Sequence, residues 1–341
     1  RATSTQHQSQ FQHQSQLSNL YVNDNAGYSK TLNQCYLTSL KDISEKDMAI
    51  LKEHLNTLET YQISPFKKDK TKINYFITKH WAPQDDNDIK INERVYFTNE
   101  NAKIIDRTMY YIHTYVDEKH KPYILAPLLV QCSMYNNTNG QFSAYFKDKT
   151  KKVGKFGGHN EIDIKRITTR IKPIMPLLTN HKVNVHISQK DVNDWIDDIP
   201  EVDLLYLDPP YNKHPYCIYY FLLDIINNWD TTIEIPKTNR GQPKTWNKSM
   251  FCSFKWAEKE FTTLIDKASK KAKFILLSYN NNGIIPLEKI KEIFNRYGTL
   301  YAKQFEHKPY NKLKGIASYK REGENKKIKE CLWLLHVKKK H

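Results

Sequence analysis

A run of apolar residues, Leu204-Leu205-Tyr206-Leu207, leads directly into Asp208-Pro209-Pro210-Tyr211. A continuous apolar run of this kind predicts a central parallel strand that is covered on both faces. Asp208 then lies at the carboxyl end of the strand, where open α/β sheets bind their ligands. Two consecutive prolines cannot extend a hydrogen-bonded ladder, so they end the strand and fix the backbone that presents Asp208 and Tyr211.

These residue types suit a reaction at an amine on an aromatic ring. Such an amine is a poor nucleophile because its lone pair is delocalised into the ring. The Asp208 carboxylate and the Pro209 carbonyl form an acceptor pair that can hold both amine hydrogens and free the lone pair. Tyr211 can stack on a base taken out of a duplex, which offsets part of the few kcal/mol that unstacking costs. The alternative is a plain Pro-Pro turn after a strand, with Asp208 as a turn residue.

The patterning around this segment alternates between strands and helices. Short apolar runs predict strands at 20–22, 183–187, 203–207, 274–277 and 331–337. Apolar residues at helical spacing predict helices at 44–61, 217–229, 257–270 and 286–297, and one that opens at Thr98 and carries Ile105, Met109, Ile112 and Val116 on one face. Ser44 and Thr98 are good helix caps. Strands that alternate with helices indicate a parallel α/β sheet with short connections.

The composition points to a polyanionic partner. The chain has 341 residues, of which 39% are hydrophobic, enough for one large domain or two modest ones with their own cores. Lys and Arg number 53 against 37 Asp and Glu, a formal net charge of +16. Because a basic surface concentrates polyanions, nucleic acid is the first partner to test. A Lys- and Asn-rich chain can also be a by-product of genome composition.

The five cysteines have neither a Cys-x-x-Cys pair nor a nearby His at metal-ligand spacing. Their odd number predicts a reducing compartment, the cytoplasm, and no metal site. No apolar run approaches the roughly 20 residues that a membrane span needs, and no signal peptide is visible. A soluble, intracellular protein with no membrane partner is therefore expected.

Four segments are expected along the chain. Residues 1–18 contain Gln-His-Gln-Ser-Gln twice and can bury little apolar surface, so a linker or mobile segment is predicted there. From about 62 to 160 the pattern loosens into loops rich in Lys, Asn and Tyr, which predicts an inserted, DNA-facing segment. The target-recognition insertion as a whole is placed at 62–180. Residues 19–61 and 181–341 then form the first part and the catalytic part of the main domain.

Several motifs occur in a fixed order along the chain. They are Tyr21-Val22-Asn23-Asp24 with Tyr28, Ser29 and Asn33; Phe97-Thr98-Asn99-Glu100-Asn101 with Ile105 and Asp106; Asp208-Pro209-Pro210-Tyr211-Asn212; His214-Pro215-Tyr216; Tyr220-Phe221-Leu222-Leu223; Phe251-Cys252-Ser253; and Leu277-Ser278-Tyr279-Asn280-Asn281 with Gly283. Together they resemble the Dam-like α-class of N(6)-adenine DNA methyltransferases, including its restriction–modification members. The matches cover most of residues 20–338.

The resemblance implies a fold and a reaction. The fold is a Rossmann-like methyltransferase sheet with an inserted, mainly helical or loop DNA-recognition region. The reaction is the site-specific transfer of a methyl group from S-adenosylmethionine to the exocyclic amine of an adenine flipped out of double-stranded DNA. The implied setting is a restriction–modification system with a cognate restriction endonuclease as a partner.

The resemblance also implies residue roles. Asp24 accepts hydrogen bonds from the cofactor ribose, Asp191 accepts from the cofactor's adenine amine, and Asp208 lies at the sulfonium end. The target base is contacted by Tyr211, Asn212, Tyr279 and Asn280. Local alternatives stay open, because Asp24 can be a loop acid, Asp191 a helix N-cap and Asn280 a turn residue.

One family feature is missing. The family has a Phe-x-Gly-x-Gly loop whose glycines let the backbone approach the methionine part of the cofactor. No glycine precedes Gly27, and the Gln/His/Ser repeat stands in place of that loop. Two explanations stay open, namely that part of the protein lies before residue 1 or that the cofactor site is degenerate.

Two other functions compete with adenine methylation. An N(4)-cytosine methyltransferase can hold a cytosine amine with the same acceptor pair, although Asp rather than Ser at position 208 favours adenine. A non-catalytic DNA-binding subunit is favoured by the missing glycines and disfavoured by the intact Asp208-Pro209-Pro210-Tyr211, which a pure binder does not need.

Overall fold

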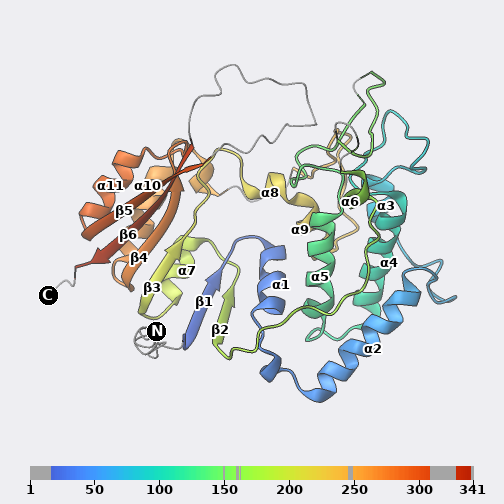
Figure 1. The fold of residues 1–341 in the computed structure, drawn as a ribbon, viewed down its shortest axis with the longest axis horizontal. Coiled ribbons are helices and arrows are strands. Elements are labelled where there is room, and N and C mark those ends of the chain that lie inside the picture. The colour runs from blue at the N-terminus through green and yellow to red at the C-terminus, as the bar shows by residue number, and fades with distance from the viewer. Residues whose placement is uncertain are drawn as a thin grey trace, which may run out of the picture.

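The computed structural model of the chain describes residues 17–307 and 328–338, except 149, 159, 160, 162 and 245–248. Figure 1 shows a sheet with its own helices on the left, a larger group of helices on the right, and β1 and β2 between them. All but the last two residues of the predicted mobile segment, 1–18, lie outside the described residues.

Six strands form two sheets among the described residues. The larger sheet has the order β3 (Val202–Leu207), β4 (Ala272–Asn280), β6 (Ile328–Val337), β5 (Gly298–His307), and the smaller one pairs β1 (Asn19–Asn23) with β2 (Asn184–Ser188). Strands β1 and β2 are parallel, as are β3 and β4, whereas β6 is antiparallel to both of its neighbours. The α/β class is confirmed, but the larger sheet is mixed rather than purely parallel.

The helices fall into two groups. One face of the larger sheet is covered by α7 (Val192–Asp198), α10 (Ala257–Ala268) and α11 (Leu287–Asn295). The second group contains α1 (Gly27–Tyr36), α2 (Glu45–Tyr61), α3 (Phe76–Trp81), α4 (Asn99–Tyr115), α5 (Lys121–Met134), α6 (Ile164–Ile167), α8 (Tyr216–Tyr219) and α9 (Phe221–Asn228). Two 3₁₀ turns lie within the described residues, η1 (Leu40–Asp42) and η3 (Met250–Cys252). Both predicted caps are confirmed, since Ser44 accepts a hydrogen bond from the amide of Asp47 and Thr98 from that of Asn101.

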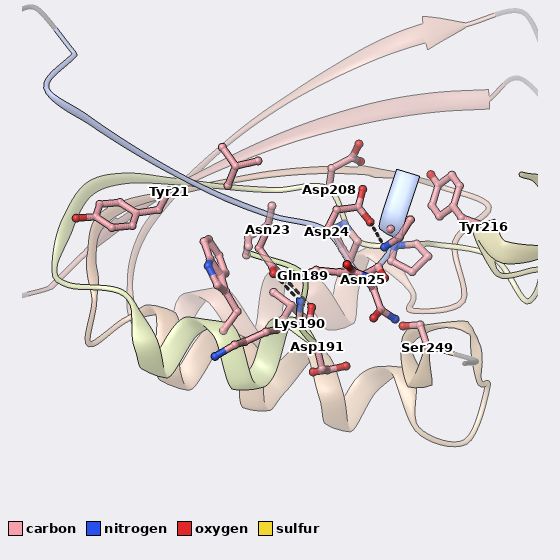
Figure 2. Close-up of a pocket in the computed structure, with 18 of the residues that line it drawn as sticks. Tyr21, Asn23, Asp24, Asn25, Gln189, Lys190, Asp191, Asp208, Tyr216 and Ser249 are labelled. Carbon is pink, nitrogen blue, oxygen red and sulfur yellow. Dashed lines mark hydrogen bonds between the residues drawn. The ribbon is translucent and has the colours of Figure 1, made fainter. Parts of the chain in front are cut away.

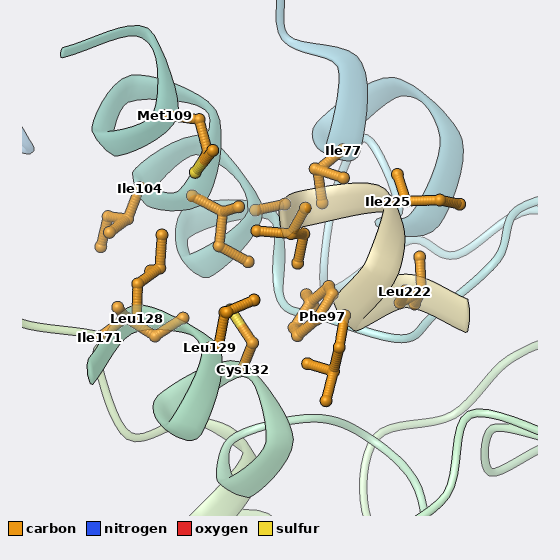
Figure 3. Close-up of a cluster of buried hydrophobic side chains, with 14 of the residues drawn as sticks. Ile77, Phe97, Ile104, Met109, Leu128, Leu129, Cys132, Ile171, Leu222 and Ile225 are labelled. Carbon is orange, nitrogen blue, oxygen red and sulfur yellow. The ribbon is translucent and has the colours of Figure 1, made fainter. Parts of the chain in front are cut away.

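The helical group has its own apolar core. The predicted apolar face of α4 is buried, and Met109 packs into a cluster that includes Leu129 of α5 and Ile225 of α9 (Figure 3). This core also takes residues from α2, before position 62, and from α9, after position 180. The helices of region 62–180 therefore share a core with residues on both sides of it, and its role in DNA recognition stays a prediction.

Asp106 anchors α3 inside this core. It is completely buried, and its carboxylate accepts hydrogen bonds from the amides of Ile77 (2.8 Å) and Thr78 (2.9 Å) and from the Thr78 hydroxyl (2.6 Å). Asp106→Ala would leave these donors buried without an acceptor, so we expect a loss of about 3 kcal/mol in the free energy of unfolding. Chemical denaturation measures this loss. The exposed Asp88→Ala is the matched control and should change stability by less than about 0.5 kcal/mol. A similar small effect for both variants would contradict the prediction.

Strand β3 differs from the sequence-based expectation. Leu205 and Leu207 are buried beneath α10, but Leu204 and Tyr206 on the other face are 54% and 56% exposed. The expectation that the strand is covered on both faces is therefore wrong for the described part of the chain. The reason is that α7, α10 and α11 all pack on the face that carries Leu205 and Leu207, and no described helix covers the face that carries Leu204 and Tyr206.

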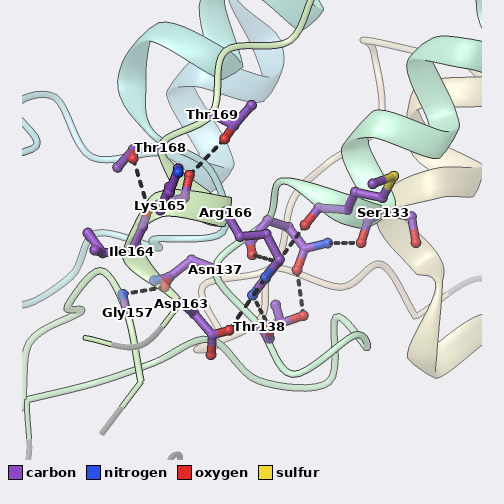
Figure 4. Close-up of polar contacts among 12 residues, drawn as sticks. Ser133, Asn137, Thr138, Gly157, Asp163, Ile164, Lys165, Arg166, Thr168 and Thr169 are labelled. Carbon is purple, nitrogen blue, oxygen red and sulfur yellow. Dashed lines mark hydrogen bonds and ion pairs between the residues drawn. The ribbon is translucent and has the colours of Figure 1, made fainter. Parts of the chain in front are cut away.

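The long loop between α5 and α6 is tied down by polar side chains (Figure 4). The Arg166 guanidinium donates to the carbonyls of Asn136 (2.9 Å) and Thr138 (3.0 Å). The Asn137 side chain donates to the Lys155 carbonyl (2.9 Å) and accepts from the Gly157 amide (3.1 Å). These hydrogen bonds therefore fix the base of the loop that carries the lysine-rich stretch.

Candidate active site

A cavity of about 1600 Å³ separates the two sheets. Its walls include the length of β1 on one side and the length of β3 on the other. Three carboxylates that follow strand ends, those of Asp24, Asp191 and Asp208, also line it, as do Pro209 and Pro210 (Figure 2). The structure therefore brings the three acids that the sequence singled out to one cavity.

Asp24 and Asp191 are placed by the pairing of β1 with β2. The last pair of the parallel register is Asn23 with Ser188. Just beyond it, the Asn23 side chain accepts from the Lys190 amide and donates to the Lys190 carbonyl, both at 3.0 Å. This reciprocal pair ties the two loops together, so the acids that follow directly, Asp24 and Asp191, are presented on the same side of the cavity.

Each of these two acids also has a local role. One carboxylate oxygen of Asp24 accepts a hydrogen bond from the Ala26 amide (2.9 Å), just before α1 begins. One oxygen of Asp191 accepts from the Asn193 amide (2.8 Å) and so caps α7. Both local roles that the sequence allowed, a loop acid for Asp24 and an N-cap for Asp191, are therefore present. The same hydrogen bonds fix the two carboxylates, which also line the cavity.

Asp208 is the least engaged of the three acids. It follows the last residue of β3, is exposed to the cavity and accepts no hydrogen bond from any described residue. Partial burial in the cavity wall raises the pKa of its carboxyl above the ordinary value. An unpaired acceptor in partly desolvated surroundings is suited to bind a donor such as a ring amine.

Tyr211 lies beside the cavity and is held from behind. Its carbonyl accepts from the Ile284 amide (2.8 Å), and its half-buried ring meets Tyr279 edge to face, with centroids 6.0 Å apart. Tyr279 is 2% exposed, and its hydroxyl accepts from the Ile285 amide (3.1 Å). In this arrangement Tyr279 supports Tyr211, and its predicted contact with a base stays a prediction.

The other two predicted base contacts also make local hydrogen bonds. Asn280 is 4% exposed and accepts from the Asn282 amide (3.0 Å). Asn212 accepts from the His214 amide (2.8 Å). Neither side chain is among those that line the cavity, so their predicted roles also stay predictions.

Two residues near the cavity were missed by the sequence analysis. Tyr216 lines the cavity and is 46% exposed. Asp224, on α9, accepts from the Tyr28 amide (3.5 Å) and so caps the start of α1, and burial raises the pKa of its carboxyl to about 6. The motif His214-Pro215-Tyr216 was a signal for the first residue. No local signal marks the second, because its partner is 196 positions away.

Neither a metal cluster nor a membrane-spanning helix is present among the described residues. Within the described ranges, no group of three or more His, Cys, Asp or Glu side chains is placed to hold a metal ion. No helix in the same ranges is both long enough and apolar enough to cross a membrane.

A family model matches the chain over residues 9–231, and its description is D12 class N6 adenine-specific DNA methyltransferase. The match extends from the Gln/His/Ser repeat past Asp208 and covers more than half of the 341 residues.

Curated proteins that are similar to the chain include three modification enzymes. Type II methyltransferase M.NlaIII of Neisseria lactamica is 30% identical over 73% of the chain and 68% of its own length. Type II methyltransferase M.FokI of Planomicrobium okeanokoites is 28% identical over 81% of the chain and 39% of its own length. Modification methylase LlaI of Lactococcus lactis subsp. lactis is 26% identical over 76% of the chain and 38% of its own length. No solved structure matches the chain significantly.

Proposed function

The chain belongs to the D12 class of N6 adenine-specific DNA methyltransferases, and from that premise we propose that it methylates the exocyclic amine of an adenine flipped out of duplex DNA, with S-adenosylmethionine as the donor. The similarity to type II modification enzymes supports a site-specific reaction within a restriction–modification system, beside a cognate restriction endonuclease and in the cytoplasm.

One observation carries this proposal. The Asp208 carboxylate stands at the end of an apolar strand, without a hydrogen bond from the described residues, on the wall of a cavity that Asp24 and Asp191 also line. A site of this kind offers acceptors for hydroxyl and amine donors at several points around one space. A nucleoside cofactor and an extruded base both present such donors.

The side chains fit part of S-adenosylmethionine. Asp24 is suited to accept from the ribose hydroxyls and Asp191 from the cofactor's adenine amine, since both carboxylates line the cavity and both are fixed by backbone amides. When bound, this cofactor supplies an electrophilic methyl group. Of the described glycines, Gly27 alone lines the cavity, so a glycine turn for the methionine end is not seen.

The residues around Asp208 prepare the acceptor amine. The Asp208 carboxylate and the Pro209 carbonyl each accept one amine hydrogen, which draws the nitrogen lone pair out of conjugation with the ring. Pro209 and Pro210 hold these two acceptors on a stiff backbone, so little reorganisation is needed when the base arrives. Tyr211 provides an aromatic surface for the base.

Cofactor affinity is expected to be weak. The described residues offer acceptors for the nucleoside part but no glycine turn whose amides reach the cofactor carboxylate. We predict a dissociation constant above about 100 µM, or less than about 5.5 kcal/mol of binding free energy. Calorimetry with the chain alone measures it, and Asp24→Ala should weaken it further. Low-micromolar binding would show that other residues replace the glycine turn.

The proposed reaction is tested with random-sequence duplex DNA and millimolar S-adenosylmethionine carrying a labelled methyl group. Label in the DNA, followed by sequencing that maps the modified positions, should give one short recognition sequence. Unlabelled DNA at saturating cofactor would favour the non-catalytic alternative.

A further inference from the structure

Tyr216 is the one large aromatic residue after the Pro-Pro turn that both lines the cavity and is well exposed to it, as far as the described residues show. It is the first residue of α8 and follows the buried Pro215. The side chain of Gln242 donates to the carbonyl of the next residue, Cys217 (3.1 Å), and so holds the start of this short helix.

The ring of Tyr216 rests on a supported platform. It is stacked on Tyr220, with centroids 6.2 Å apart and an interplanar angle of 15°. Tyr220 in turn contacts Tyr28 of α1, with centroids 6.0 Å apart. Tyr216 is therefore supported by a neighbouring aromatic ring, and 46% of the residue remains exposed.

The charged groups that act on Tyr216 include Asp208, the residue proposed to hold the reacting amine. Burial raises the pKa of the Tyr216 hydroxyl to about 12, and the charge of Asp208, Tyr211 and Asp24 adds to this shift. The ring is thus neutral at physiological pH. Figure 2 draws Tyr216 among the side chains that line the cavity, together with Asp208 and Asp24.

We propose that Tyr216, supported by Tyr220, is a second aromatic surface on which the target adenine stacks while Asp208 and Pro209 hold its amine. This inference rests on the proposed function and extends it by one contact residue. Tyr211 has part of its surface taken up by Tyr279, whereas Tyr216 is open to the cavity. An adenine ring can come either from DNA or from the cofactor, and Asp208 beside Tyr216 favours the DNA base.

The test uses the full chain, an unmodified duplex with the mapped target adenine for turnover, a second duplex with 2-aminopurine at that position for base capture, and four variants. Tyr216→Ala removes the ring, Tyr216→Leu keeps apolar bulk without a ring, and Tyr216→Phe keeps the ring. Tyr301→Ala is the matched control, because Tyr301 is also well exposed but lies on β5. Thermal unfolding checks that every variant is folded.

Stacking on an aromatic ring is worth roughly 1–3 kcal/mol per base, about 5- to 150-fold in affinity. We therefore expect Tyr216→Ala and Tyr216→Leu to lower kcat/KM by at least fivefold and to brighten 2-aminopurine in the complex, because the captured base loses a quenching partner. Tyr216→Phe and Tyr301→Ala should stay within twofold of the wild type in both measurements.

A second arm distinguishes the two sources of adenine. Binding of S-adenosylmethionine without DNA should be the same for the wild type and Tyr216→Ala. If the substitution weakens cofactor binding and leaves the 2-aminopurine signal unchanged, Tyr216 belongs to the cofactor pocket and the inference is overturned. An active wild type with an equally active Tyr216→Ala also overturns it. A wild type that methylates no DNA refutes the proposed function, and the inference with it.

Discussion

Asp208→Ala is expected to abolish methyl transfer and to leave DNA binding largely intact. Its carboxylate is proposed to act directly on the reacting amine, and removing one preorganised polar group at a reacting centre costs about 3 kcal/mol or more, roughly 150-fold in kcat. Single-turnover rates on a duplex with one mapped site measure this loss. Equilibrium binding to the same duplex should change by less than threefold, because Asp208 faces the cavity and not the lysine-rich loops.

The control for this variant is on the same strand. Asp203 is exposed and lines the same cavity, but it lies near the amino end of β3, away from the Pro-Pro turn. Asp203→Ala should keep wild-type turnover within about twofold. Equal losses for the two variants would point to a general effect of charge in the cavity and would contradict a specific role for Asp208.

The pH dependence of the wild type gives a second measure of the same role. Desolvation raises the pKa of Asp208, and only its ionised form accepts the amine hydrogen without competing as a donor. The rate should therefore be full at neutral pH and should fall on acidification at a higher pH than an ordinary aspartate would give. Asp208→Asn should lose this dependence together with most of the rate.

The affinity for DNA is expected to fall by about three decades between 50 and 200 mM salt. This expectation rests on the net charge of +16. A protein that neutralises ~6 phosphates loses about three decades of affinity over this range of salt concentration. Arg94 and Arg166 donate to backbone carbonyls inside the protein, so the phosphate contacts should come mainly from lysines. Exposed lysines are grouped at Lys67, Lys68, Lys70, Lys72, Lys147, Lys151 and Lys152.

Charge reversal in one loop tests where these contacts lie. Lys151→Glu with Lys152→Glu should weaken binding and reduce the salt slope by about 2, since each lost phosphate contact removes about 0.9. Lys291→Glu on α11 is the matched control, because Lys291 is exposed but lies on the sheet side of the molecule (Figure 1). A flat salt profile for the wild type would exclude binding dominated by the lysine-rich loops.

The elements that could be read from the sequence are those with strong local signals. Ser44 and Thr98 cap their helices as predicted, and the apolar run from Leu204 to Leu207 forms a strand that ends at the Pro-Pro turn. The placement of Asp208 on the cavity wall follows from this, because a strand end fixes where the next side chain lies. The positions of Asp24 and Asp191 follow in the same way from β1 and β2.

The elements that could not be read depend on distant partners. Helix α1 has no capping side chain of its own and is capped by Asp224 of α9. Strand β5 mixes exposed polar residues with aromatic ones, and among the described strands it pairs only with β6. The spacing of residues along β6 is the same for a parallel and an antiparallel strand, so it does not predict the direction. Leu204 and Tyr206 were expected to be buried, and their exposure depends on which elements pack on that face of β3.

The identity of the methylated base tests the central claim most directly. Duplex DNA is incubated with the chain and saturating S-adenosylmethionine, digested to nucleosides and analysed by mass spectrometry. The account predicts N(6)-methyldeoxyadenosine from the wild type and at least a hundredfold less from Asp208→Ala. Methyl groups found on the N(4) atom of deoxycytidine, or N(6)-methyldeoxyadenosine formed equally well by Asp208→Ala, would contradict it.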